Sequence, residues 1–532
     1  MKPAYWYGGL AALLLLALAL RLHGIGNPIL DHPGWRQGDT AAIARNFALR
    51  RFDIMYPQTT YNGPPPNYVE LELQIVPFLA AVLYKIFGVH EIFGRTITLA
   101  FSLGTVAVLT LFGRWLFGSA IAGLAAGFFF AIFPGSVYYG RTFTPDCAMV
   151  FFLSAALYAA ARALLDREKL DWPPLLWSTA LLTLAYLAKP VAVLAVAPLI
   201  ALVWQRAFAR KPTPVLPVAT LFVVPLLLLW LYDRRVASYA EWHWASGITK
   251  LHVLPALAAA LTGVSALAAK LTNFRIVLGM LRSTMLGGIS FLLSIAVFAS
   301  LNWIPARSKA LLWAWLGGGL LYVFVVVTVE RVDYYMFPLL PLCALAIGGL
   351  LGRVVDFIRA TDAAPAARYA LLSIPLLIAA AAAGTSRSAV AAYYGYNANA
   401  YRTAKALDAA LAPNALVVIG HYGPDVQYYI DRFGWEEDPI LWTPFDEESA
   451  IRKGARYFIS IEDRRLRRNL ELCAWLERFP AVGFGDWRVY QTSPGRTVPD
   501  ADKFWRAFRG AERTGRGREF LDAHNVCVIP QP

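Results

Sequence analysis

The chain carries few charged residues for its length. Of its 532 residues only 16% are Asp, Glu, Lys or Arg, whereas 58% are hydrophobic and 14% are aromatic. Soluble globular domains carry about 25% charged residues, so this composition excludes that class and indicates a polytopic membrane protein with aromatic belts at the interfaces. The formal net charge of +14 does not indicate a nucleic-acid partner, because the basic residues lie mostly at the ends of apolar runs and in the C-terminal region. Membrane topology and anionic lipids account for them.

Several motifs that would indicate other functions are missing. The seven histidines do not cluster, and no Cys/His spacing of the zinc-site kind occurs. No GxGxxG follows a strand pattern, so nothing indicates a nucleotide fold, and there is no internal repeat. The four cysteines separate into two in apolar runs, Cys147 and Cys343, and two in the C-terminal region, Cys473 and Cys527. In an oxidising compartment the second pair forms a disulfide or stays as two buried thiols, and the sequence favours neither.

The apolar runs predict the fold class, since a spanning helix needs about 20 mostly apolar residues. We predict a polytopic α-helical membrane domain over residues 1–385, with an outer loop at 23–95, followed by a soluble α/β domain over 386–532. The first run is interpreted as an uncleaved anchor, because only Lys2 precedes it and no small-residue cleavage site follows it. The pair that meets at Lys189-Pro190 represents either two short spans or one kinked segment. About 11 spans are expected, near 5–22, 96–116, 119–137, 146–163, 174–189, 190–206, 215–232, 281–301, 309–328, 335–352 and 368–385.

Lysine and arginine in the short loops predict the orientation. If the spans alternate, these basic residues gather on one side, which is then cytoplasmic. The opposite side receives the segment 23–95, the long loop 233–280 and everything after about residue 386. This topology requires the moderately apolar stretch 74–89 to lie in the outer interface without crossing it. We therefore expect a multi-pass protein of the inner (plasma) membrane, with its C-terminal domain on the periplasmic or outer side. The loop residues used are Arg114, Arg162, Arg167, Lys169, Arg206, Arg210, Lys211, Arg307, Lys309, Arg353, Arg359 and Arg368.

The C-terminal region has the pattern of a small α/β domain. The segments ALVVIG, ARYFISIE and DWRVYQT predict strands, and helical patterns occur around 401–411 and 465–478.

Carboxylates on the predicted outer face are the candidate catalytic groups. Asp39 precedes the helix-like stretch TAAIARNF, so it serves either as a helix N-cap or as a general base that takes the proton of an attacking hydroxyl or amine. Asp31 in the same loop competes for the role of base. Asp146 opens a span after a short outer turn, where it either caps the helix or orients a substrate. Glu70 is interpreted either as an interfacial solvated residue or as a substrate contact.

Basic and aromatic residues at the same face are the candidate substrate contacts. Guanidinium groups grip phosphate oxygens through two bonds, which favours Arg36, Arg95 and Arg141 for a phosphate at the outer leaflet. Lys189 ends its apolar run and either snorkels or neutralises a phosphate leaving group. The segment TVERVDYYMFPLLP adds Arg331 and Tyr335 to this face, although its tyrosines also suit an aromatic belt.

Three segments resemble the GT-C superfamily of polyprenyl-phosphate-sugar glycosyltransferases. They are DHPGWRQGDTAAIARNF, FGVHEIFGRTITLAFSLGTVAVLTLFGRWLFG followed by YYGRTFTPDCAMVFF, and ERVDYYMFPLLPL. The likeness is to the branch that contains protein O-mannosyltransferases and the transferase that adds aminoarabinose to lipid A, that is, family 39/83 type enzymes of lipopolysaccharide and protein glycosylation. It extends over most of the first 350 residues.

The resemblance implies a hexosyl- or pentosyltransferase that moves a sugar from a polyprenyl phosphate to an envelope lipid, glycan or protein, with inversion. Asp39, or failing that Asp31, matches the catalytic carboxylate, and Asp146 matches the second acidic position. Arg141, Lys189, Arg331 and Tyr335 match substrate contacts. No cofactor is certain; a divalent cation is allowed, although Thr40 stands where many relatives complete an Asp-Glu pair. A lipid or glycan flippase and a non-catalytic envelope scaffold are the alternatives. A transporter should carry ionisable residues in mid-span or show paired halves.

Overall fold

Contacts divide the chain into two compact units. The computed structural model describes residues 2–299, 306–362 and 364–527. One unit, the helical unit, comprises Met1–Gly26, Glu70–Tyr239 and His243–Tyr394, and the other, the sheet unit, comprises Asn27–Val69, Ala240–Trp242 and Gly395–Pro532. The sequence-based division kept the whole loop 23–95 with the membrane domain and began the C-terminal domain at 386. By contacts, most of that loop folds with the C-terminal region.

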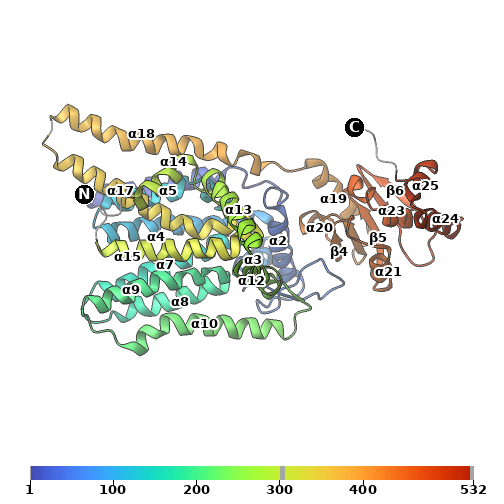
Figure 1. Cartoon of the computed structure of the whole chain (residues 1–532), viewed down its shortest axis with the longest axis horizontal. Helices are drawn as coiled ribbons and strands as arrows, with labels where there is room; N and C mark the ends of the chain where they lie inside the picture. Colours follow the sequence, from blue (N-terminus) through green and yellow to red (C-terminus); the bar gives the residue numbers. More distant parts are fainter. Residues whose placement is uncertain (1, 300–305, 363, 528–532) are drawn as a thin grey trace. The chain divides into compact units, whose positions relative to one another are not determined.

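The helical unit is a bundle of long apolar helices (Figure 1). Its central helices α4, α5, α7 and α17 pack against one another. In the described part of the chain ten helical segments are long and apolar enough to cross a membrane: Pro3–Leu22 (α1), Glu91–Phe117 (α4), Asp146–Leu165 (α7), Pro190–Phe208 (ending in α9, Val196–Phe208), Val215–Ala237 (α10), Trp244–Thr262 (ending in α12, Leu254–Thr262), Val264–Met285 (beginning with α13, Val264–Met280), Ser308–Glu330 (mainly α15, Ala306–Tyr322), Asp333–Ala360 (ending in α17, Leu340–Ala360) and Pro365–Ala389 (α18).

Most of the expected spans coincide with these helices, and the shorter ones have identifiable breaks. The run 119–137 is interrupted after α5 (Ala120–Ile132), because Pro134 cannot continue the hydrogen-bond pattern, and α6 (Pro134–Tyr139) follows. Lys189 separates α8 (Trp172–Ala188) from the next helix with an extended backbone (φ −165°, ψ 118°), so two helices meet there. The run 281–301 contains α14 (Gly288–Ala299), and its last residues lie outside the described part.

The expectation of a long loop at 233–280 was wrong. This segment contains the last turn of α10, the short strand β2 (Trp242–His243), the short helix α11 (Trp244–Gly247) and the apolar helices α12 and α13. Lys250, His252, Lys270 and Arg275 dilute the hydropathy of the segment, and this concealed the two helices in the sequence. The stretch 74–89 forms α3 (Ile75–Phe87), whose 13 residues are fewer than a span requires.

The sheet unit holds a five-stranded sheet in the order β4-β3-β5-β7-β6. β3 is parallel to both β4 and β5, whereas β7 is antiparallel to β5 and β6. The three strands expected from sequence are β3, β5 and β7; the short strands β4 and β6 were not expected. The bounds are α2 Gly34–Leu49, β1 Val69–Glu70, α19 Ala398–Ala410, β3 Leu416–Gly420, α20 Pro424–Ile430, β4 Gly434–Glu437, α21 Pro444–Arg452, β5 Ala455–Ser460, α22 Asp463–Leu466, α23 Leu470–Leu476, β6 Ala481–Phe484, β7 Trp487–Tyr490, α24 Ala501–Arg513 and α25 Gly517–Ala523.

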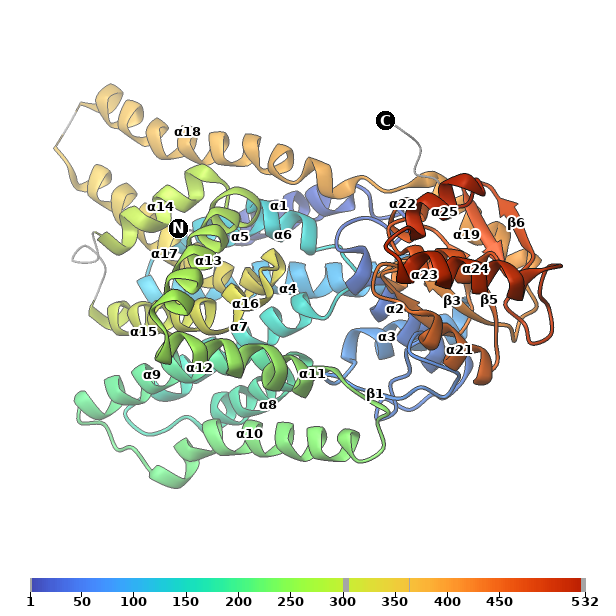
Figure 2. The same cartoon turned by 45° about the vertical axis from the view of Figure 1, so that its right-hand side comes forward.

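Helices α23, α24 and α25 pack together against the sheet (Figure 2), and their buried residues contact a cluster that includes residues of β3 and β5. Phe458 and Tyr490 from the strands form one buried cluster with Trp475 and Phe508 from the helices. Cys473 and Cys527 lie in the same cluster and form a disulfide with their Cα atoms 6.2 Å apart. The structure thus decides between the two states that the sequence left open, while Cys147 and Cys343 are free and buried.

Candidate active site

Asp39 lies inside a helix of the sheet unit. α2 begins at Gly34 after Pro33, so Asp39 is more than a turn beyond the helix start and is not its N-cap. Its side chain is 1% exposed. One carboxylate oxygen accepts a hydrogen bond from Arg36 Nη1 at 2.9 Å and the other from the Tyr61 hydroxyl at 3.0 Å. Because a carboxylate offers about four acceptor positions, it can still accept a proton from a substrate while both partners stay in place.

The surroundings of Asp39 favour its neutral form more than water does. Burial raises the pKa of this carboxyl above its usual range, and the Arg36 guanidinium and the Tyr61 hydrogen bond oppose that rise. The same burial, together with the charge of Asp39, raises the pKa of Tyr61, so its phenol remains a hydrogen-bond donor. A carboxylate with a raised pKa is a stronger proton acceptor than one in water, which suits a general base.

Asp31 is also fully buried, but its main partner differs. Gln37 Nε2 donates to Asp31 Oδ1 at 2.7 Å and to the Asp31 carbonyl oxygen at 3.0 Å. The amide is neutral and closes the turn that leads into α2. Through these bonds Gln37 ties Asp31 to the start of α2, whereas Arg36 and Tyr61 donate to Asp39.

Two glycines allow α2 to pack closely against α20. A Cβ at Gly38 would lie 2.5 Å from the Cα and 2.6 Å from the N of Asp425, and a Cβ at Gly34 would meet the Asp425 carboxylate. Only hydrogen fits at Gly38, and a Cβ at Gly34 would require the Asp425 side chain to move. The sequence GWRQG thus brings the helix backbone directly onto the first turn of α20.

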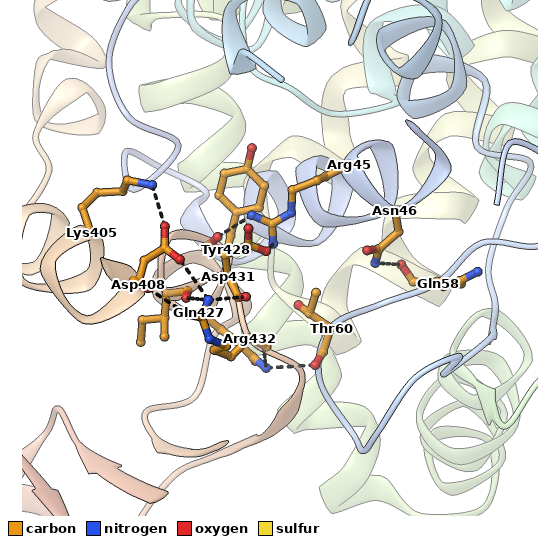
Figure 3. A network of polar contacts seen from close by, with 11 residues as sticks. Arg45, Asn46, Gln58, Thr60, Lys405, Asp408, Gln427, Tyr428, Asp431 and Arg432 are labelled. Carbon is orange, nitrogen blue, oxygen red and sulfur yellow. Dashed lines mark hydrogen bonds and ion pairs between the residues drawn. The ribbon is translucent and has the colours of Figure 1, made fainter. Parts of the chain in front are cut away.

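Near the C-terminal end of α2, a polar network also joins this helix to α20 and the residues around it (Figure 3). Arg45 donates to the Tyr428 carbonyl oxygen at 2.8 Å and pairs with Asp431 at 2.9 Å. Gln427 Nε2 donates to the Thr60 carbonyl oxygen at 2.9 Å. These bonds join the first loop to the C-terminal part of the sheet unit and fix the helix that carries Asp39.

In the helical unit Asp146 pairs with Lys189. Asp146 begins α7, Lys189 directly follows α8, and the ammonium lies 2.5 Å from Asp146 Oδ1. The same ammonium lies 5.0 Å and 4.7 Å from the ring centres of Tyr334 and Tyr335. Asp146 Oδ2 is buried and has no hydrogen-bond partner among the described residues. A buried carboxylate oxygen left without a donor is costly for a structure and typical of a functional site.

Arg95 and Arg141 converge on one backbone oxygen. Both are fully buried, and their Nη1 atoms donate to the Gly24 carbonyl oxygen at 2.8 Å and 2.9 Å, just beyond the end of α1. The Arg141 guanidinium also lies 4.6 Å from the ring centres of Tyr138 and Tyr394. The structure therefore brings together two of the arginines predicted to hold phosphate.

The other two predicted residues of the helical unit have different neighbours. Glu70 accepts hydrogen bonds from the backbone N–H and the hydroxyl of Ser246. Arg331 has a left-handed backbone (φ 53°) and lines a hollow of about 330 Å³ together with Lys270 and Asn273. Neither is brought beside the Asp146–Lys189 pair by these contacts.

Two residues that the sequence did not single out as site residues, Tyr61 and Asp333, make buried hydrogen bonds. Asp333 accepts hydrogen bonds from the hydroxyls of Tyr139 and Tyr393, both at 2.6 Å, and from Thr284 at 3.2 Å. Its place at the start of DYYMFP was a usable signal. No local pattern signals Tyr61, because its partner Asp39 is 22 residues away. Within the described ranges no group of three or more His, Cys, Asp or Glu side chains is arranged to hold a metal ion.

Comparison with known proteins identifies the fold. Residues 74–230 match the family described as Dolichyl-phosphate-mannose-protein mannosyltransferase. A comparison with curated protein sequences finds no match. The structure is similar to ArnT from Cupriavidus metallidurans bound to undecaprenyl phosphate, with a TM-score of 0.59 and 12% identity over 92% of this chain and 99% of that one. It is also similar to the archaeal oligosaccharyltransferase AglB from Archaeoglobus fulgidus in complex with an inhibitory peptide and a dolichol-phosphate (TM-score 0.61, 13% identity, 94% and 75% covered). The resemblance noted in the sequence is thus confirmed: the chain is a multi-span membrane protein with the fold of the GT-C glycosyltransferases.

Proposed function

We propose that the protein transfers a sugar from a polyprenyl-phosphate donor to an envelope lipid, glycan or protein, with inversion at the anomeric carbon. The observation that carries the proposal is the Asp39 carboxylate, buried in α2 between Arg36 and Tyr61 with a raised pKa. It stands in a protein with the GT-C fold, and the ArnT and AglB structures named above contain undecaprenyl phosphate and dolichol-phosphate.

In the proposed reaction Asp39 is the general base. As the acceptor hydroxyl or amine attacks the anomeric carbon, its proton passes to Asp39 and the bond from that carbon to the phosphate oxygen breaks. Polyprenyl phosphate leaves with the bonding electron pair. Arg36 and Tyr61 hold the carboxylate in one orientation, and such positioning together with electrostatic stabilisation accounts for most of the catalysis that this chemistry needs.

The donor phosphate is proposed to be held by the buried cations of the helical unit. Lys189, Arg95 and Arg141 are the buried candidates, and their charge would offset the phosphate as the sugar leaves. Asp146 fixes Lys189 through the pair described above. Tyr335, Arg331, Glu70 and Arg36 remain substrate-contact proposals.

The reaction is assigned to the periplasmic or outer side of the inner membrane. Disulfides persist in oxidising compartments, and the sheet unit contains the Cys473–Cys527 disulfide. The distribution of lysine and arginine in the short loops supports the same orientation.

The test replaces the native protein in its host with Asp39→Asn, Asp31→Asn or the control Asp522→Asn, an exposed carboxylate on α25. Loss of a general base lowers rates by about 10²- to 10⁴-fold, so Asp39→Asn should remove one sugar residue from an envelope glycan, as read by mass spectrometry. Asp522→Asn should leave the product intact. All variants should insert at native levels.

Normal product with Asp39→Asn would rule out this base, and normal product with every buried carboxylate variant would indicate a scaffold. A flippase is distinguished by a second assay on the purified protein. Incubated with polyprenyl-phosphate sugar and acceptor membranes, a transferase releases free polyprenyl phosphate, whereas a flippase returns the donor intact.

A further inference from the structure

A second polar cavity lies within the sheet unit. It has a volume of about 360 Å³, which falls within the range of about 300–1,000 Å³ that small-molecule sites occupy. Its polar lining includes Asn399, Thr403, His421, Glu462 and Asp486, and Trp487 supplies an aromatic wall. None of these residues belongs to the candidate active site.

The cavity occupies a place where open α/β sheets bind ligands. β3 and β5 are parallel neighbours. The chain continues from β3 to β4 on one side of this pair and from β5 to β6 and β7 on the other, so the two connections diverge. His421 directly follows β3, and Ile461 and Glu462 directly follow β5. Ligands bind at such switch points, outside the carboxyl ends of the strands. Ser460, the last residue of β5, has a buried hydroxyl without a hydrogen-bond partner among the described residues.

The charge of the lining disfavours an anionic ligand. His421 Nδ1 lies 2.9 Å from Glu462, and its Nε2 lies 3.5 Å from Asp425. Burial alone would lower the pKa of this imidazole, but the two carboxylates raise it to about 9. The lining contains three carboxylates, those of Asp425, Glu462 and Asp486, and its described residues include no lysine or arginine. Arg465, outside the lining, pairs with Glu462 at 3.1 Å, so His421 and Arg465 together leave the three carboxylates with an excess of one negative charge. A phosphate or a uronic acid would therefore be repelled.

The lining suits a ligand rich in hydroxyl groups. Amide, hydroxyl and carboxylate side chains offer donors and acceptors to hydroxyls, and an indole offers an apolar face to C–H groups. A primary amine on the ligand would be attracted by the excess of carboxylates.

We propose that this cavity binds a neutral or amine-bearing sugar unit of the acceptor. The proposal rests on the glycosyltransferase function above and specifies the acceptor as a saccharide or a molecule that carries one. Asp425 connects the cavity to the helix that carries Asp39. This residue lines the cavity, and Gly34 and Gly38 of α2 pack closely against it. The cavity and the helix that carries Asp39 therefore share one wall within the sheet unit.

Binding is tested on the full-length protein in nanodiscs, without donor, by saturation-transfer NMR. The probes are methyl glucoside, glucosamine and glucuronate at equal concentration. We expect the first two to bind and glucuronate to bind at least tenfold more weakly. Thr403→Val and Asp486→Asn should each weaken binding by about tenfold, the effect of losing one hydrogen bond to a buried or charged partner, and Asp522→Asn should leave binding unchanged.

Equal binding of glucuronate, equal binding by the cavity variants, or no binding of any probe would overturn the proposal. The envelope assay separates an acceptor sugar from a free saccharide: for an acceptor subsite, Thr403→Val and Asp486→Asn should reduce the modified glycan to about a tenth, and unchanged product would refute it. Asp39→Asn should bind the probes normally. Loss of product in Asp39→Asn with unaltered cavity variants would refute only the cavity, whereas sugar binding without any transfer would refute the function.

Discussion

The helical unit and the sheet unit each bury a carboxylate beside a cation, but they assemble the pair in different ways. In the sheet unit Arg36 and Asp39 are three residues apart on one helix. In the helical unit Asp146 and Lys189 are 43 residues apart and come from the start of α7 and the end of α8. The first pair is fixed by helix geometry alone, because side chains three apart lie on the same face. The second pair exists only because two helices pack.

The two pairs also differ in how completely they are satisfied. Both oxygens of Asp39 accept a hydrogen bond, whereas one oxygen of Asp146 accepts none among the described residues. The locally built pair is therefore held in one orientation by two donors, while the remote pair keeps one buried acceptor oxygen without a donor among the described residues.

The largest effect is expected from removing the Cys473–Cys527 disulfide, which stabilises the sheet unit. Cys473→Ser with Cys527→Ser opens a loop of 54 residues, which should lower the free energy of unfolding of the sheet unit by about 4 kcal/mol. Limited proteolysis read by mass spectrometry should show cleavage concentrated after residue 395. The matched control is Cys343→Ala in the helical unit. Equal protection of the double variant and the native protein would refute the prediction.

Breaking the remote pair should destabilise the helical unit nearly as much. Lys189→Met leaves Asp146 as a buried charge without its cation, which costs about 3 kcal/mol. Adding Asp146→Asn should restore most of the loss, because the uncompensated charge is then gone. Thermal unfolding in detergent measures the series, and a double variant no more stable than Lys189→Met alone would show that the charge is not the cause.

The contact between α2 and α20 is expected to tolerate an added methyl group at Gly34 but not at Gly38. Gly38→Ala places a Cβ against the backbone of Asp425, which should cost about 2 kcal/mol of overpacking. Gly34→Ala meets only the Asp425 carboxylate, which can rotate away, so its cost should be smaller. Thermal unfolding and transfer rate should both follow this order, and a reversed order would contradict the packing described here.

The smallest effect concerns the local pair and its titration. Arg36 holds the pKa of Asp39 below the value that burial alone would give, so Arg36→Met should raise that pKa further. The proposed base works only when deprotonated, so the acid limb of the pH–rate profile should move to higher pH in Arg36→Met. Arg36→Lys keeps the charge and should leave the limb near its native position. A limb that stays in place in Arg36→Met would remove Asp39 from the role of base.

The sequence predicted some helices correctly and others wrongly, and the difference has a physical reason. The runs that became α1, α4, α7 and α10 were recognisable, because hydropathy over about 20 residues is a local property. The segment 233–280 was misjudged because scattered basic residues reduced that signal. Asp39 was singled out from its loop, but its expected alternative role as an N-cap disappeared once the helix was found to begin at Gly34.

Local sequence pattern is enough to indicate a multi-span membrane protein with a C-terminal α/β region, and helical spacing brings Arg36 and Asp39 within reach of each other. Tertiary structure alone decided that Tyr61 reaches Asp39, that Lys189 reaches Asp146, that Cys473 pairs with Cys527, and that the first loop folds with the C-terminal region. The physical reason is the range of the forces involved. Apolar length and helical spacing are set by neighbours along the chain, whereas partners tens to hundreds of residues apart meet only when packing removes them together from water.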